Sequence, residues 1–215
     1  MRVSLHLVAA AILIWCTSAA AITLFPASPM RLPLLGGCAL GVLAGLVLRR
    51  MPVWLSTHAH ELSHAIAALA TRGRVHQLHV SGRGNGHVVH DSRMVRLVSM
   101  APYTLPLATV IGVAAVAAGM PMDRATRCVV LTALFGLHVM MVSRDIRACR
   151  RHGWHGTDFG ADHPVLLLGW VVAINMMTFL AVTSYAAGGG RGILDASGAV
   201  VARLGQIPRL LAGVL

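Results

Sequence analysis

The chain has 215 residues, of which 56% are hydrophobic and only 12% charged, and its mean hydropathy is +0.72. Soluble domains carry about twice that share of charged residues, so the composition excludes an ordinary soluble domain and indicates an integral membrane protein. The formal net charge of +11 is the balance of 18 cationic side chains and seven acidic ones, and the cations are all arginines that flank apolar runs singly or in short clusters. This distribution fits contacts with lipid head groups and argues against a nucleic-acid partner.

Two apolar runs occupy residues 1–48, which we expect to form N-terminal membrane helices. The first run, residues 4–25, reads either as an uncleaved anchor or as a signal peptide, and its continuation past the small residues at 18–21 favours the anchor. The second run, residues 34–48, ends at Arg49-Arg50. Its glycines at positions 36, 37, 41 and 45 would let a neighbouring helix approach closely.

The third apolar run, residues 53–70, contains His60-Glu61-Leu62-Ser63-His64. Residues four apart share a helix face, so both imidazoles can bind one metal ion, with Glu61, the only glutamate in the chain, beside them. In zinc metallopeptidases the two histidines of this pattern hold Zn²⁺ and the glutamate is the catalytic base. The alternative is a helix whose histidines bond to backbone carbonyls. Ionisable groups in an apolar membrane-length run are costly, which favours the functional interpretation.

A β-hairpin at the membrane surface is predicted within residues 75–91. Residues 75–80 and 87–90 are short β-type runs, and the segment between them is rich in Gly, Ser and Asn. The hairpin carries four histidines, which we interpret as polar positions on a solvated hairpin in preference to a second metal site.

Three further spans complete the predicted fold: residues 95–118, broken by Pro102 and Pro106, residues 128–143, and residues 164–187. The chain is therefore predicted to be an α-helical polytopic membrane protein with about five or six membrane helices, including the motif helix. Residues 49–187 would form a metallopeptidase-like core. Residues 188–215 would form a C-terminal tail, with an amphipathic helix on the membrane surface.

A catalytic zinc site needs a third protein ligand and one open position. Asp158 lies just before the last span, where a carboxylate could reach the site. His138 lies in the middle of a span and is the alternative third ligand. Asp162, in the same loop as Asp158, is a weaker candidate for the same role. The four cysteines are scattered without C-x-x-C spacing, so they predict no cysteine zinc site.

The arginine clusters predict the orientation of a multi-pass protein in a cell membrane. Arg49-Arg50 and the cluster at residues 144–151 would face the cytoplasm, with the loops at residues 26–31 and 119–123 outside. The use of arginine without lysine is typical of a GC-rich genome, and we expect a bacterial cytoplasmic membrane.

On these residues the chain resembles the site-two protease family of intramembrane zinc metallopeptidases. The resemblance covers about residues 50–185 and rests on the motif at residues 60–64, the hairpin, the broken span around Ala101-Pro102-Tyr103 and the late Asp158. It implies His60, His64 and Asp158 as zinc ligands and Glu61 as the base. The third-ligand motif of that family has Asp followed by Gly, often after Asn-Pro, and this chain contains neither pair.

The sequence therefore favours an intramembrane zinc metalloendopeptidase, of the kind that performs regulated intramembrane proteolysis, with a membrane-protein segment bound as an extra strand along the hairpin. One alternative is a non-proteolytic metal-binding or metal-transporting membrane protein, which would have no need of a base between two ligands. The other is an inactive protease relative, which would be expected to have lost a ligand or the base.

Overall fold

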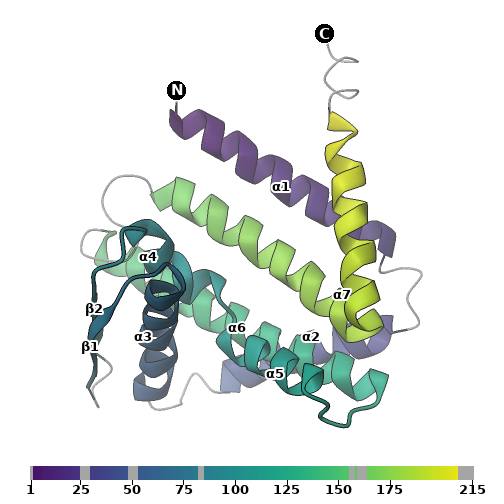
Figure 1. Cartoon of the computed structure of the whole chain (residues 1–215), viewed down its shortest axis with the longest axis horizontal. Helices are drawn as coiled ribbons and strands as arrows, with labels where there is room; N and C mark the ends of the chain where they lie inside the picture. The colour runs from purple at the N-terminus through teal and green to yellow at the C-terminus, as the bar shows by residue number, and fades with distance from the viewer. Residues whose placement is uncertain are drawn as a thin grey trace.

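A computed structural model describes residues 2–24, 30–47, 53–81, 85–154, 158 and 164–207 of the chain. These residues form helices joined to one small sheet (Figure 1). The elements in chain order are α1 (Arg2–Leu24), α2 (Arg31–Val47), α3 (Val53–Ala70), β1 (Val75–Val80), β2 (Gly86–His90), α4 (Val95–Thr104), α5 (Leu107–Ala117), α6 (Arg124–His152) and α7 (Pro164–Leu204).

The helices pack so that α7 lies between α1 and α6, and α2 packs on α6 (Figure 1). The hairpin, α3 and α4 gather at one end of this arrangement, where α3 contacts α4 and both strands. The predicted order of helices and hairpin is thus present, and the motif helix is held between the hairpin and the broken helix.

In the described part of the chain, two helices are long and apolar enough to cross a membrane, Arg124–Arg151 and Pro164–Leu204. The pair α4 and α5 would make a third span if the two are counted as one. In α1 and α2 the apolar stretches are shorter, Ala10–Ala21 and Arg31–Val47. The His, Ser, Thr and Glu residues of α3 lower the hydropathy of that helix. The structure therefore supports a helical membrane protein, while the expected count of about five or six membrane helices is not confirmed.

Close packing of α2 on α6 depends on glycine. A Cβ atom on Gly37 would collide with Thr132, one on Gly41 with the carbonyl of Ala133, and one on Gly45 would lie 2.6 Å from Cβ of Met140. Gly36 faces open space. The glycines at 37, 41 and 45 form one face spaced by four residues, so the expected close helix approach is confirmed for this face.

The broken helix separates at one proline. α4 and α5 are bent by 75°, and Pro106 stands at the break as the residue before α5, whereas Pro102 lies inside α4. Because Leu107 no longer continues the helix, the carbonyl of Tyr103 needs another donor. The amide Nδ2 of Asn175 in α7 donates to it at 2.6 Å, which ties the break to α7.

The long helix α7 contains a break of its own at Gly189, whose φ of 62° is a left-handed conformation that favours glycine. Near this break the guanidinium Nε of Arg127 donates to the carbonyl of Ala186 at 2.9 Å. Beyond it, Ala196 is buried against Ala20 and Leu180. The predicted tail is therefore helical to residue 204, where it packs on α1 and on the first part of α7, and its place on the membrane surface stays a prediction.

The hairpin pairs β1 with β2 in antiparallel register, with His79 opposite His87 and Val80 opposite Gly86. Residues 82–84 of the predicted turn lie outside the described residues. At the base of the hairpin the backbone N–H of Arg74 donates to Asp91, and this bond lowers the pKa of the Asp91 carboxyl. The rings of His79 and His87 lie 5.4 Å apart and both residues are exposed, as expected for polar positions on a solvated strand.

Candidate metal centre

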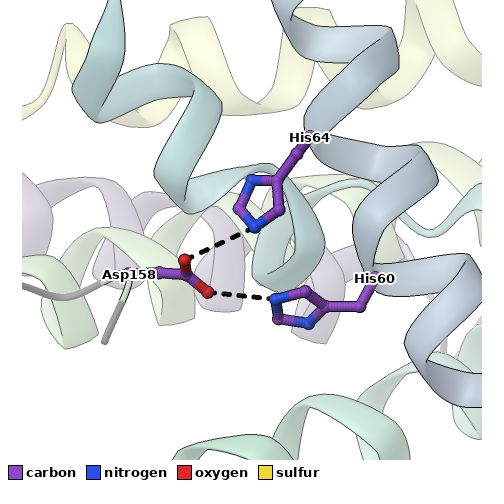
Figure 2. A group of neighbouring side chains, drawn as sticks. All are labelled: His60, His64 and Asp158. Carbon is purple, nitrogen blue, oxygen red and sulfur yellow. Dashed lines mark hydrogen bonds and ion pairs between the residues drawn. The ribbon is translucent and has the colours of Figure 1, made fainter. Parts of the chain in front are cut away.

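The two motif histidines come from successive turns of α3 and point to the same side of the helix (Figure 2). Their ring centroids are 5.0 Å apart, and 18% of the His60 side chain and 10% of the His64 side chain are exposed. Glu61 follows His60 directly and is buried, with 7% of its surface exposed. The sequence prediction that one helix face presents both imidazoles is therefore met in the structure.

Asp158 approaches this pair from the other side (Figure 2). Its Oδ2 lies 3.0 Å from Nε2 of His60, and its Oδ1 lies 3.4 Å from Nε2 of His64. One ligand atom from each residue lies within 4.8 Å of the others. In a tetrahedral zinc site with bonds of about 2.0–2.1 Å, neighbouring ligand atoms are about 3.3 Å apart. Two imidazoles and one carboxylate at these separations are a donor set that suits zinc.

Hydrogen bonding gives a further reason to expect a cation between these groups. The carbonyl oxygen of Val98 lies 2.8 Å from Nδ1 of His64, and because a carbonyl only accepts, Nδ1 must donate. In the neutral ring Nε2 then carries a lone pair, and this lone pair faces the carboxylate of Asp158. Two electron-rich atoms at 3.4 Å require a proton or a metal ion between them.

The free carbonyl of Val98 is a consequence of the sequence four residues later. In a regular helix the amide of residue 102 would donate to this carbonyl, but Pro102 has no N–H. The carbonyl is therefore left for the imidazole of His64. A proline inside α4 thus fixes the ring nitrogen that His64 turns toward the site.

The carboxylate of Asp158 is held by a third group. The hydroxyl of Tyr103, which is 2% exposed, donates to Oδ2 of Asp158 at 2.9 Å. Burial raises the pKa of the Asp158 carboxyl, but when protons occupy the place of a metal ion between the groups, the hydrogen bonds and positive charge of His60 and His64 outweigh it and hold this pKa well below its usual range. Asp158 is therefore an anion, the form in which a carboxylate binds a metal ion.

The side chain of Glu61 lies against β2 and is not one of the three converging donors. A Cβ atom on Gly86, the first residue of β2, would be 2.7 Å from Oε1 of Glu61, so the start of this strand lies against the glutamate side chain. The carboxylate is thus confined between the motif helix and the hairpin, beside the histidines.

A cavity of about 60 Å³ opens beside His60, between α3, the break after α4, and α6. This is room for several water molecules. Its polar lining consists of Ser56, His60, Ser63, His138 and Asp145, and its apolar lining of Ala59, Pro102, Leu105, Leu107, Ala108, Leu134, Leu137 and Met141. The broken helix thus provides a partly polar chamber next to the histidines.

The alternative third ligand is directed elsewhere. Nε2 of His138 lies 3.2 Å from Oδ1 of Asn175, and His138 is not among the donors that converge on one point within the described residues. It lines the cavity beside His60. Asp162 lies outside the described residues.

Residues 34–150 match the model of the Peptidase M50B-like family. The chain belongs to this family. It is the site-two protease family of intramembrane metallopeptidases, so the resemblance seen in the sequence is confirmed. No curated protein and no solved structure matches the chain significantly. The matched part of this M50B-like protein contains the motif, Tyr103 and most of α6, and Asp158 lies just beyond it.

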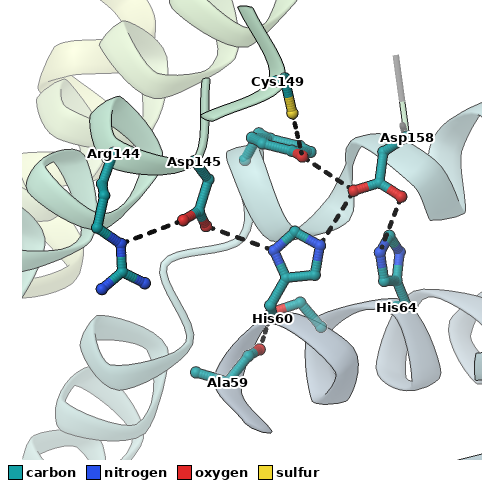
Figure 3. A network of polar contacts seen from close by, with 9 residues as sticks. Ala59, His60, His64, Arg144, Asp145, Cys149 and Asp158 are labelled. Atoms are coloured by element: carbon teal, nitrogen blue, oxygen red, sulfur yellow. Dashed lines mark hydrogen bonds and ion pairs between the residues drawn. The ribbon is translucent and has the colours of Figure 1, made fainter. Parts of the chain in front are cut away.

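Three features of the M50B-like site were not predicted from the sequence: the carbonyl of Val98, the hydroxyl of Tyr103 and the carboxylate of Asp145 on α6. Oδ2 of Asp145 lies 3.5 Å from Nδ1 of His60 (Figure 3). Asp145 was missed in the sequence because it lies inside an arginine cluster, and such a cluster indicates a membrane boundary. A signal did exist: it is one of only seven acidic residues and follows His138 by two helical turns.

Proposed function

We propose that this M50B-like protein is a zinc endopeptidase that hydrolyses peptide bonds in membrane-embedded or membrane-proximal segments of other membrane proteins. One observation carries the proposal: the ligand atoms of His60, His64 and Asp158 converge, and Glu61 lies between the two histidines on the same helix. A site that only bound metal would have no need of a buried carboxylate in that position.

In this proposal His60, His64 and Asp158 hold the ion. When bound, zinc polarises a peptide carbonyl and lowers the pKa of water from 15.7 to about 7. Glu61 accepts a proton from water as the water oxygen bonds to the carbonyl carbon, and delivers this proton to the nitrogen of the leaving amine. The peptide C–N bond then breaks to give a carboxylic acid and a neutral amine. The cavity beside His60 supplies water, and its apolar wall fits the side chains of a membrane segment.

The hairpin is the proposed docking element for the substrate. A two-stranded sheet has one unpaired backbone edge on each strand, and an extended peptide can add there as a third strand. Because Gly86 of β2 borders Glu61, a segment paired with β2 would pass beside the proposed base. Helices must unwind locally before their peptide bonds can be cut, and strand addition offers the unwound segment replacement hydrogen bonds.

We further propose that α6 and α7 cross a bacterial cytoplasmic membrane, with the arginines at residues 144–151 on the cytoplasmic side. Asp158 follows α6 directly along the chain, so the metal centre would lie near that face. The substrates would then be cut close to the cytoplasmic boundary.

The proposal is tested with purified protein in liposomes that also contain a bacterial total membrane-protein fraction as substrate. Mass spectrometry of new peptide ends reads cleavage, and metal analysis reads bound zinc. The wild type should bind one zinc ion and produce new ends. Glu61→Gln should retain zinc, because the amide keeps the shape of the carboxylate, and should lose cleavage by about 10²–10⁴-fold.

His60→Ala serves as the control that should lose both zinc and cleavage. Zinc bound by the wild type without any new peptide ends would favour the metal-handling or inactive alternatives. Cleavage at the wild-type rate by Glu61→Gln would remove the base assignment, and loss of zinc in that variant would make Glu61 part of the metal-binding set.

A further inference from the structure

The imidazole of His60 lies between two carboxylates from different parts of the chain (Figure 3). Nε2 is 3.0 Å from Oδ2 of Asp158, and Nδ1 is 3.5 Å from Oδ2 of Asp145. The ring therefore has one nitrogen directed toward the converging donors and the other directed away from them, toward α6.

The two motif histidines share this arrangement but differ in the partner of the outward nitrogen. Nδ1 of His64 faces the backbone carbonyl of Val98, a neutral acceptor. Nδ1 of His60 faces a carboxylate, which accepts more strongly because it is charged. An acceptor at Nδ1 keeps the ring proton on that nitrogen and leaves the lone pair of Nε2 for a metal ion.

Asp145 is itself held in place. Its Oδ1 lies 3.4 Å from Nε of Arg144, while its Oδ2 faces His60, so the two oxygens have separate partners. The carboxylate also lines the cavity beside His60, and 25% of its side chain is exposed. It is thus a partly buried anion directed at a single ring nitrogen from a helix that contributes no ligand of its own.

We propose that Asp145 is a positioning residue that accepts the Nδ1–H of His60, and thereby sets the tautomer and ring orientation with which His60 binds zinc. This inference rests on the proposed zinc site. A carboxylate behind a metal-binding histidine fixes the ring and makes its free nitrogen more basic, and loss of such a partner costs typically about 10–100-fold in metal affinity or activity.

The test measures zinc affinity by competition with a chromophoric chelator, for the full chain in detergent. Asp145→Ala should weaken zinc binding by about 10–100-fold while the protein still binds one ion at saturation. Asp145→Asn should recover part of this loss, because its amide oxygen still accepts the Nδ1–H but carries no charge. Asp195→Asn and Asp195→Ala, at an exposed acid of α7, are the matched controls and should leave the affinity unchanged.

The thermal unfolding of the metal-free variants distinguishes positioning from support of the fold. A residue that only stabilised α6 would lower the unfolding temperature and leave zinc affinity unchanged, and that result would overturn the inference. So would a loss of stoichiometric binding as complete as that of His60→Ala, which would make Asp145 a ligand. A wild type that binds no zinc would end both the proposed function and this inference, whereas unchanged affinity in Asp145→Ala would end this inference alone.

Discussion

Gly86 of β2 lies directly against Glu61 of α3, so closely that a Cβ atom on the glycine would be 2.5 Å from Cγ of the glutamate. The hairpin and the motif helix therefore meet at the proposed base. Any side chain at position 86 must displace the carboxylate of Glu61, because this carboxylate is the movable partner of the contact.

Gly86→Ala should therefore separate metal binding from catalysis. The methyl group would push the glutamate aside, since the three atoms nearest to it all belong to Glu61. Displacement of a catalytic group by about 1 Å can cost about 10²-fold in rate. We expect zinc content at the wild-type level and cleavage reduced about 10²-fold, measured from the rate at which new peptide ends form in liposomes.

Gly198→Ala is the control for this substitution, since a Cβ atom there would meet no atom within 4 Å. It should leave zinc content and cleavage unchanged. A Gly86→Ala protein that cuts at the wild-type rate would show that Glu61 does not act from this position.

The third ligand is tested by comparing Asp158 with His138. Asp158 faces both motif histidines, whereas His138 faces Asn175. Asp158→Ala should abolish tight zinc binding and cleavage together, because two imidazoles alone form an incomplete site. His138→Ala should keep the metal. If metal analysis finds the reverse pattern, the site is built from three histidines.

The order of helices and hairpin was predictable because its signals are local, whereas the expected number of membrane helices is not confirmed. The His-Glu-x-x-His spacing places two imidazoles on one face of α3 whatever the helix packs against, and the glycine-rich segment before Gly86 predicts a hairpin from turn chemistry alone. The glycines at positions 37 and 41 likewise predicted a close helix contact, although the sequence did not show that α6 is the partner.

What the sequence did not reveal depends on long-range packing or on backbone atoms. Asp158 reaches the histidines across about a hundred residues of chain, so its candidacy could be proposed but its contacts could not. The carbonyl of Val98 has no side-chain signal of any kind. The two prolines of the broken span were predicted to act alike, yet Pro106 stands at the break and Pro102 acts inside the helix by freeing a carbonyl.

Tyr103→Phe should weaken zinc binding without disturbing the fold. The substitution removes only the hydroxyl that donates to Oδ2 of Asp158, and the buried ring remains. Loss of a hydrogen bond to a metal-binding carboxylate is expected to cost about 10–100-fold in zinc affinity. Chelator competition measures this change, with Tyr185→Phe, the same substitution at the other tyrosine, as the control that should have no effect. Equal affinities in the two variants would show that the hydroxyl does not support Asp158.

Pro102→Ala is expected to weaken the metal site although it removes a proline from the interior of a helix. Alanine restores an N–H that can donate to the carbonyl of Val98, and this new helical bond competes with the Nδ1–H of His64. His64 would then be held less firmly, with zinc affinity lower by about tenfold. Interior proline is unfavourable in helices, so the unfolding temperature of the metal-free protein should be unchanged or higher.

Pro121→Ala, at an exposed residue outside the helices, is the control. A Pro102→Ala protein with wild-type zinc affinity would show that the carbonyl accepts both donors without loss, and that the proline serves only the shape of α4.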